Sequence, residues 1–197
     1  MFTHRPRCSI ISQDIYVGYR NYGKDLEPLF AFGHGLSYST FEYSDLYATP
    51  PSFKDTFNVS FTVKNTGDFA GSEVAQVYIA DPVSTLPRPA KELKGFTKVY
   101  LGKNESKTVN IELGRDAISF YDDRKKTWIA EEGIFEVQVA ASSRPEDIKL
   151  RKNVTLGKTF TWNGLWNGEK FAVYWNNIEV YDVAYFVEIM FSQLLWS

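Results

Sequence analysis

Residues 57–64 read FNVSFTVK, and this stretch decides the fold. Positions 57, 59, 61 and 63 are apolar, and polar side chains alternate with them. A period of two places the apolar side chains on one face of an extended chain, which predicts a half-buried β-strand. The next residues, Asn65-Thr66-Gly67, are turn formers, so we expect a hairpin or a turn between two sheets to follow.

More short strands follow at regular spacing. The segment EVAQVYIA at 73–80 predicts a second strand, and it has apolar residues on both faces. Gly, Asn, Asp and Pro residues separate the other expected strands, which cover 91–101, 107–113, 117–121, 127–130 and 133–140. About seven such strands predict an all-β fold, an antiparallel β-sandwich of the immunoglobulin or fibronectin type III kind.

Two segments interrupt or precede this pattern. Residues 81–89 (DPVSTLPRP) contain three prolines. Proline has no backbone N–H for a strand ladder, so this segment is expected to be an exposed crossing loop. Residues 15–22 (IYVGYRNY) are apolar and aromatic but too short to have a core of their own, so their packing partners are expected elsewhere.

Residues 161–197 differ in character and have no assigned role. A membrane span is not expected, because about 20 apolar residues are required and Glu179, Asp182 and Glu188 interrupt the run. A helix packed on the sandwich and a poorly ordered end are the alternatives. Apolar residues fall roughly at helical spacing at Val180, Val183, Val187, Met190 and Leu194.

Charge and cysteine content exclude several classes of function. The formal net charge is -2, with 22 basic and 24 acidic side chains spread along the chain. No basic stripe could neutralise a phosphate backbone, so a nucleic-acid partner is not expected. The single cysteine, Cys8, cannot form an internal disulfide. No Cys and His group has metal-ligand spacing, and no glycine-rich nucleotide motif is present, so no cofactor is expected.

Three sequons indicate a secretory route. Asn58-Val-Ser, Asn104-Glu-Ser and Asn153-Val-Thr match the acceptor pattern for N-glycosylation. Residues 1–13, however, lack the apolar run of about 7 to 15 residues that a signal peptide needs. The sequence therefore predicts either an intracellular protein or a chain without its true N-terminus.

His34 is the first candidate for chemistry. It lies between Gly33 and Gly35 in FAFGHGLSYSTF (30–41), and a histidine on such a loop can titrate near neutrality. It has no evident partner, because the other histidine is His4 and no G-x-S-x-G nucleophile motif is present. We favour a structural role, in which the glycines permit a tight backbone path and His34 bonds to a neighbouring carbonyl.

Paired carboxylates are the second candidate. Glycoside hydrolysis uses two carboxyl groups about 5 to 9 Å apart, and Asp122-Asp123 and Glu131-Glu132 are adjacent in the sequence. Neighbours on a strand point to opposite faces, and acidic turn residues usually face solvent. Neither pair is therefore assigned a catalytic role.

Tryptophans are the third candidate, because sugar rings stack on exposed aromatic faces. Trp128 and Trp162 are the candidate sugar-stacking residues. The five tryptophans are scattered, however, and burial is the more common fate of a large aromatic side chain.

One long segment carries a family resemblance. Residues 16–46 (YVGYRNYGKDLEPLFAFGHGLSYSTFEYSDL) resemble the seam of fungal family 3 glycoside hydrolases, mainly β-glucosidases. In that family the seam joins a middle α/β domain to a C-terminal fibronectin type III-like domain. The resemblance covers roughly residues 15–156 and continues through FTVKNTGDFAGSEVAQVYIADP (61–82), RPAKELKGFTKVYLGKNESKTV (88–109) and GIFEVQVAASS (133–143).

The resemblance implies a domain organisation. Residues 1–36 would be a remnant of the preceding α/β domain and its linker, 37–160 the fibronectin type III-like domain, and 161–197 a divergent tail. The linker would be anchored by Phe30 and Phe32 and turned by the glycines at 33 and 35, so that His34 becomes a seam residue. A truncated gene model or a partial product would explain both divergent ends.

The resemblance also implies a non-catalytic function. The family's nucleophilic aspartate and acid/base residue precede the seam, so no residue here is carried over as catalytic and the chain alone is expected to be inactive. Its role would be to stabilise the catalytic domains of a β-glucosidase that hydrolyses terminal β-D-glucosyl residues outside the cell. The alternative is a stand-alone carbohydrate-binding or interaction sandwich, with β-glucan or oligosaccharide as a partner.

Overall fold

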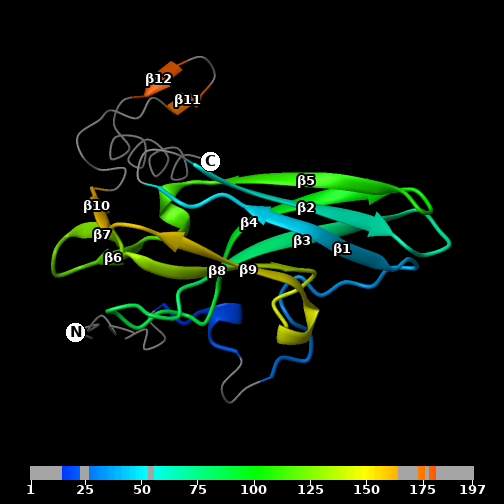
Figure 1. Ribbon diagram of the computed structural model, residues 1–197, viewed down its shortest axis with the longest axis horizontal. Helices are drawn as coiled ribbons and strands as arrows, with labels where there is room; N and C mark the ends of the chain where they lie inside the picture. The colour runs from blue at the N-terminus through cyan, green and yellow to red at the C-terminus, as the bar shows by residue number, and fades with distance from the viewer. Residues whose placement is uncertain (1–14, 23–26, 53–55, 164–172, 176–177, 181–197) are drawn as a thin grey trace, which may run out of the picture. The chain divides into compact units, whose positions relative to one another are not determined.

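The computed structural model describes residues 15–22, 27–52, 56–163, 173–175 and 178–180 (Figure 1). The chain divides into two compact units, Met1–Tyr121 with Ile129–Phe160 and Asp122–Trp128 with Thr161–Ser197. Helical structure in the described residues consists of three short 3-10 turns, η1 (Gly18–Arg20), η2 (Arg115–Ala117) and η3 (Pro145–Asp147). Among these residues no helix has the length and apolar character needed to cross a bilayer.

The first unit contains two antiparallel sheets, which confirms the predicted all-β sandwich (Figure 1). The three-stranded sheet has the order β1-β2-β5 and the four-stranded sheet the order β4-β3-β8-β9. The seven strands are β1 (Phe41–Ala48), β2 (Phe57–Asn65), β3 (Gly71–Ala80), β4 (Glu92–Leu101), β5 (Ser106–Leu113), β8 (Gly133–Ala140) and β9 (Ile148–Leu156).

Shorter strands complete the described structure. A three-stranded sheet has the order β10-β7-β6, and β11 pairs with β12 in an antiparallel hairpin. Their bounds are β6 (Phe120–Asp122), β7 (Thr127–Ala130), β10 (Phe160–Trp162), β11 (Val173–Trp175) and β12 (Ile178–Val180). Val180 thus belongs to a strand, and the rest of the predicted helical spacing, from Val183 to Leu194, lies outside the described residues.

The core lies between the two large sheets, as the alternation in β2 predicts. Phe57, Val59, Phe61 and Val63 are all buried and belong to one cluster with residues of β1, β3, β4, β5, β8 and β9. Removing a large apolar side chain from water contributes about 1.5–3 kcal/mol. Repeated along the strands of both sheets, this burial makes the cluster the main source of stability in the sandwich.

Several elements differ from the expectations drawn from sequence. Residues 117–121, expected to be a strand, are divided between η2 and β6. Strands β1 and β9 of the sandwich were not expected, nor were the short strands β10, β11 and β12. In β1, Asp45 has a φ of 57°, and the register shifts between Ser44 and Tyr47. This irregularity breaks the period of two and conceals the strand in the sequence.

The predicted turn after β2 connects the two sheets and is organised by Asn65. This side chain is fully buried. Its Nδ2 donates hydrogen bonds to the carbonyls of Phe69 (2.8 Å) and Leu101 (3.1 Å), and its Oδ1 accepts one from the N–H of Gly67 (2.9 Å). One amide therefore satisfies three backbone groups, two in the turn itself and one at the end of β4.

Replacing Asn65 with alanine is expected to lower the free energy of unfolding by about 2–4 kcal/mol, because buried backbone groups would lose their partners. Urea denaturation monitored by circular dichroism measures the change. Asn58→Ala is the matched control, because Asn58 lies on the same strand with an exposed side chain. Equal midpoints for the two variants would contradict this role of Asn65.

Candidate functional site

Strand β3 is buried on both faces, and the N-terminal segment covers its outer face. Ala75, Val77 and Ile79 point into the core, whereas Gln76 and Tyr78 alternate with them and are still buried. The apolar residues that the sequence shows on both faces of this strand are therefore covered by two different parts of the chain.

Tyr19, in η1, provides much of this cover. Its ring packs edge-on against the ring of Tyr78, with 5.8 Å between centroids, and its hydroxyl accepts a hydrogen bond of 2.7 Å from the N–H of Leu93. Sequence reasoning placed the packing partners of 15–22 elsewhere. Tyr19 has its partners outside this segment, on β3 and β4, whereas Ile15, Val17 and Tyr22 remain exposed.

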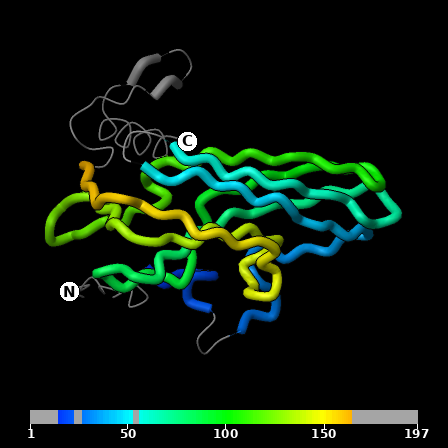
Figure 2. The backbone as a smooth tube through the Cα atoms, in the orientation of Figure 1, coloured from blue at the N-terminus to red at the C-terminus, as the bar shows by residue number. Residues whose placement is uncertain are grey.

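Residues 27–40, which we call the linker, lead from this segment to β1 (Figure 2) and meet the same face of β3 at Gln76. Gly33 has a φ of +82°, and a Cβ at this position would lie 2.1 Å from Nε2 of Gln76. Gln76 is itself fixed, because its Nε2 donates to the carbonyl of Ala141 at 2.8 Å. The N–H of Ser143 donates to the carbonyl of Phe32, also at 2.8 Å. Backbone contacts therefore hold the linker against the sheet.

The linker nevertheless leaves large apolar side chains in solvent, and we call this set the linker patch. These residues and their exposed fractions are Leu29 (85%), Phe30 (67%), Phe32 (52%), Leu36 (96%) and Tyr38 (97%). Phe32 is partly anchored, because its ring lies 5.4 Å from that of Tyr19. Five such side chains within ten residues form an apolar surface of the kind that marks an interaction site.

His34 lies at this surface and has no catalytic geometry. Its ring packs against Phe30, with 5.3 Å between centroids, and its backbone N–H donates to the carbonyl of Ala31 at 2.9 Å. Among the described residues no side chain forms a hydrogen bond with the imidazole. The structure therefore places His34 in a turn of the linker, and a Cβ on Gly35 would meet open space.

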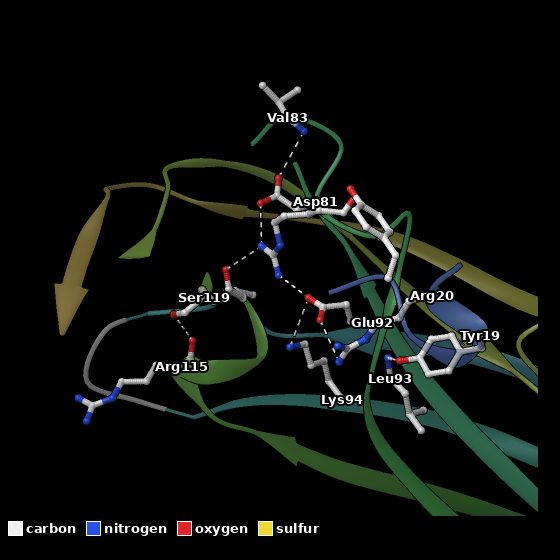
Figure 3. Close-up of polar contacts among 12 residues, drawn as sticks. Tyr19, Arg20, Asp81, Val83, Glu92, Leu93, Lys94, Arg115 and Ser119 are labelled. Atoms are coloured by element: carbon white, nitrogen blue, oxygen red, sulfur yellow. Dashed lines mark hydrogen bonds and ion pairs between the residues drawn. The ribbon is translucent and has the colours of Figure 1, made fainter. Parts of the chain in front are cut away.

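A buried charge cluster ties the N-terminal segment to the proline-containing loop and to β4. Arg88 Nη1 lies 2.9 Å from Asp81 Oδ2, and Arg88 Nη2 lies 2.7 Å from Glu92 Oε2. Glu92 also pairs with Arg20 (3.2 Å) and Lys94 (3.6 Å). Figure 3 shows Arg20 and Lys94 converging on Glu92, with Tyr19 beside Leu93.

Burial and charge act in opposite directions on the two carboxyl groups. Burial raises the pKa of Asp81, and the guanidinium of Arg88 opposes this shift. Burial also acts to raise the pKa of Glu92, but Lys94, Arg88 and Arg20 outweigh it and hold the pKa below its usual value. Glu92 is thus ionised in the folded state, where it links three cations from different segments.

The loop 81–89 is held at its middle and at its two ends. It forms no strand, as expected, but it joins β3 to β4, which pair within one sheet, so it does not cross between the sheets. Thr85, at its middle, donates from its N–H (3.0 Å) and its hydroxyl (2.5 Å) to the two carboxylate oxygens of Glu131. Arg88 pairs with Asp81 and so links the two ends, whereas Val83 is exposed.

A hollow of about 800 Å³ lies between the N-terminal segment, the start of β4 and the β8–β9 loop. Its lining includes Tyr16, Tyr22, Lys91 and Arg144. The ammonium of Lys91 is buried without a hydrogen-bond partner among the described residues and lies 5.0 Å from the centroid of the Tyr78 ring. Burial, and next the charge of Arg151, lower the pKa of Lys91 to about 8.

The adjacent carboxylates do not form catalytic pairs. Asp122 Oδ1 accepts hydrogen bonds from the N–H groups of Arg124 and Lys125, as a turn residue does. Desolvation acts to raise the pKa of Asp122, but these donors outweigh it and lower the pKa. Glu131 binds Thr85, and the side chain of Glu132 is exposed. No group of three His, Cys, Asp or Glu residues in the described part of the chain could hold a metal ion.

The candidate sugar-stacking residues stack on each other. The rings of Trp128 and Trp162 lie 5.4 Å apart with 19° between their planes, and both side chains are half-buried. Thr127 donates from its hydroxyl to the carbonyl of Trp162 at 3.0 Å. One face of each indole is therefore occupied within the protein.

The three sequon asparagines are exposed. Asn58 lies on β2 and Asn153 on β9. Asn104 lies in the turn between β4 and β5, with a φ of 61°. All three side chains are therefore accessible to a glycosylating enzyme.

Fold and sequence together define the class of this domain. Residues 73–143, which run from β3 to the end of β8, match the fibronectin type III-like domain family. The chain therefore contains a fibronectin type III-like domain, as the sequence resemblance implies.

The similar full-length proteins are β-glucosidases. Thermostable β-glucosidase B of Acetivibrio thermocellus is 44% identical over 158 residues, which cover 77% of this chain and 21% of that protein. The β-glucosidase of Kluyveromyces marxianus, solved in complex with glucose, superposes with a TM-score of 0.71 at 46% identity, over 79% of this chain and 19% of that one. The GH3 β-glucosidase of Bifidobacterium adolescentis superposes with a TM-score of 0.69 at 33% identity. The match covers 82% of this chain and 23% of that one.

These matches confirm the resemblance to family 3 glycoside hydrolases. The chain spans about a fifth of the length of the curated relatives it matches. Sequence reasoning singled out the segment 30–41, but it did not single out Gln76, Arg20 or Glu92. The sequence gives no periodic signal for these polar residues, because their partners are brought together only by the fold.

Replacing Arg88 with methionine is expected to cost about 3–5 kcal/mol at pH 7, because Asp81 and Glu92 would remain buried without their shared cation. Chemical denaturation measures the loss. Lys103→Met is the control, since Lys103 forms an exposed pair with Asp68, and such pairs contribute about 0–1 kcal/mol.

The pH dependence gives a second readout for the charge cluster. The lowered pKa of Glu92 contributes stability that is present above the pKa of the unfolded carboxyl group and is lost as the pH falls through the folded value. In Arg88→Met, Asp81 loses its cation while Glu92 keeps Arg20 and Lys94, and acidification neutralises the carboxylate of Asp81. The difference between variant and wild type should therefore shrink toward low pH, and a constant difference would contradict the assigned role.

Replacing Gly33 with alanine is expected to displace the linker, because both its φ and the contact with Gln76 oppose a Cβ. The cost should be about 1–3 kcal/mol, with faster proteolytic cleavage between residues 29 and 38. Gly35→Ala is the matched control two residues away, where a Cβ meets open space. If both variants were cleaved at the wild-type rate, the linker would not be held as described.

Proposed function

We propose that this chain is a non-catalytic, C-terminal fibronectin type III-like domain of a family 3 β-glucosidase, and that it stabilises the catalytic domains by docking against them. The homologues support this proposal, because the chain corresponds to about a fifth of a β-glucosidase. The parent would hydrolyse terminal β-D-glucosyl residues, and its catalytic domains would be intramolecular partners of this one.

The linker patch is the observation that carries the proposal. Its side chains stand in solvent on a backbone that Gly33 and Phe32 hold against the sheet, so the patch is preformed. Removing apolar surface from water contributes about 25 cal/mol per Å². A rigid apolar linker that enters the sandwich from the preceding domain would recover this free energy by packing on that domain.

The catalytic residues would lie in the other domains of the parent β-glucosidase. The adjacent carboxylates Asp122 and Glu131 are engaged in a turn and a loop contact, and the described residues hold no group that could bind a metal ion. The isolated chain is therefore proposed to be inactive. An extracellular location and glycans at the three sequons belong to the same proposal, and the exposure of the sequon asparagines supports it.

A chimera tests this function. Residues 15–163 of this chain would replace the matching domain of the Kluyveromyces marxianus β-glucosidase. We expect the chimera to hydrolyse an aryl β-glucoside and to melt near the natural enzyme. A triple variant with Phe30, Leu36 and Tyr38 changed to serine is expected to lower the melting temperature of the chimera by several degrees, because each buried apolar side chain contributes about 1.5–3 kcal/mol.

Two controls identify the cause of that loss. The same triple variant of the isolated chain should melt like its wild type, because these side chains are solvent-exposed within the domain. Tyr47→Ser in the chimera changes an exposed aromatic on the other sheet and should have no effect. A triple-variant chimera as stable as the unmodified chimera would contradict docking through the linker patch.

A further inference from the structure

A second apolar surface lies on the outer face of the four-stranded sheet. Phe96 and Tyr100 on β4 are 69% and 68% exposed, and Val74 on β3 is 38% exposed. We call these three residues the β4 strip. Residues 96 and 100 are four apart on one strand, so both side chains project from the same face.

The strand register places the β4 strip beside the point at which the linker meets β3. Phe96 lies opposite Gln76, the residue against which Gly33 packs. Val74 lies opposite Lys98, between the two aromatic residues of β4. The outer face of β3 and β4 is thus covered by Tyr19 and the linker at one end, whereas the other end exposes Val74, Phe96 and Tyr100 together with Lys98 and Ser72.

The outer face of the three-stranded sheet is different. Strands β1, β2 and β5 expose one aromatic side chain on this face, that of Tyr47. The ammonium of Lys152 lies 5.1 Å from the centroid of its ring. The other outward-facing side chains are polar, and they are Glu42, Ser44, Asn58, Ser60, Thr62, Lys64, Ser106, Thr108, Asn110 and Glu112. This face suits solvent, and it carries the Asn58 sequon.

We propose that the β4 strip and the linker patch form one docking surface, and that its occupant is the remaining part of a family 3 β-glucosidase. This inference rests on the proposed function and names the face through which the domain acts. The matching surface would be apolar, with a carboxylate or carbonyl group opposite the ammonium of Lys98. The face of β1, β2 and β5 would stay in solvent.

Two observations favour this occupant over a second copy of the chain or a glucan. Four-fifths of the length of the curated relatives has no counterpart in this chain, so a large covalent neighbour is available. The linker meets β3 at Gln76, opposite Phe96 of the β4 strip, so a domain attached through the linker would be held at high effective concentration near this strip. A free partner would have no such advantage.

Hydroxyl-radical footprinting of the chimera and of the isolated chain tests the surface. Phe96 and Tyr100 are expected to react at least fivefold more slowly in the chimera than in the isolated chain. Tyr47 is the internal control, because it is similarly exposed and lies on the opposite face, and its rate should not change. Mass spectrometry of peptides containing each residue gives the rates.

The activity and the footprint of the chimera separate failure of the docking surface from failure of the proposed function. An active chimera with unprotected Phe96 and Tyr100 would overturn the docking surface and leave the proposed function standing, whereas an inactive or unfolded chimera would overturn both. Two results with the isolated chain would also overturn the assigned occupant. One is a dimer in light scattering that protects Phe96, and the other is protection of Phe96 by β-glucan oligosaccharides.

Discussion

Burial of strand β3 on both of its faces is the constraint on which the rest of the structure depends. One face contributes Ala75, Val77 and Ile79 to the core between the sheets. The other presents Tyr78 and Gln76, which are buried because Tyr19 and Gly33 lie on them. A sandwich strand usually has one face in solvent. Here the second face binds the segment that leads into the domain, so the core and the linker share one strand.

Polar interactions then fix the linker and the loop in place. Asn65 holds the turn between the sheets with two hydrogen bonds and reaches β4 with a third, and Arg88 holds the loop 81–89 against β4. Glu92 connects that loop to Arg20 in the N-terminal segment. A buried ion pair adds little net stability compared with apolar packing, but it is costly to break. The cluster therefore sets the position of the linker, while the apolar core supplies most of the free energy of folding.

The two outer faces of the sandwich differ in polarity, so one suits solvent and the other suits contact with a partner. The face of β1, β2 and β5 is almost entirely polar, whereas the linker patch and the β4 strip leave aromatic and aliphatic side chains exposed. A domain that served only as a solvent-facing module would have no use for such a surface, because exposed apolar patches favour association. The asymmetry agrees with a domain that makes up about a fifth of a larger enzyme.

The sequence by itself determined the sandwich, the proline-containing loop and the family resemblance, because these depend on local alternation, proline chemistry and motifs that can be read in order. It did not reveal β1, whose bulge at Asp45 breaks the alternation. Only the tertiary structure showed that Tyr19 covers Tyr78, that Gln76 requires a glycine at position 33, and that Arg20 meets Glu92. These contacts join residues more than 40 positions apart, and no periodic pattern encodes such pairs. They exist only once the folded strands have brought the segments together.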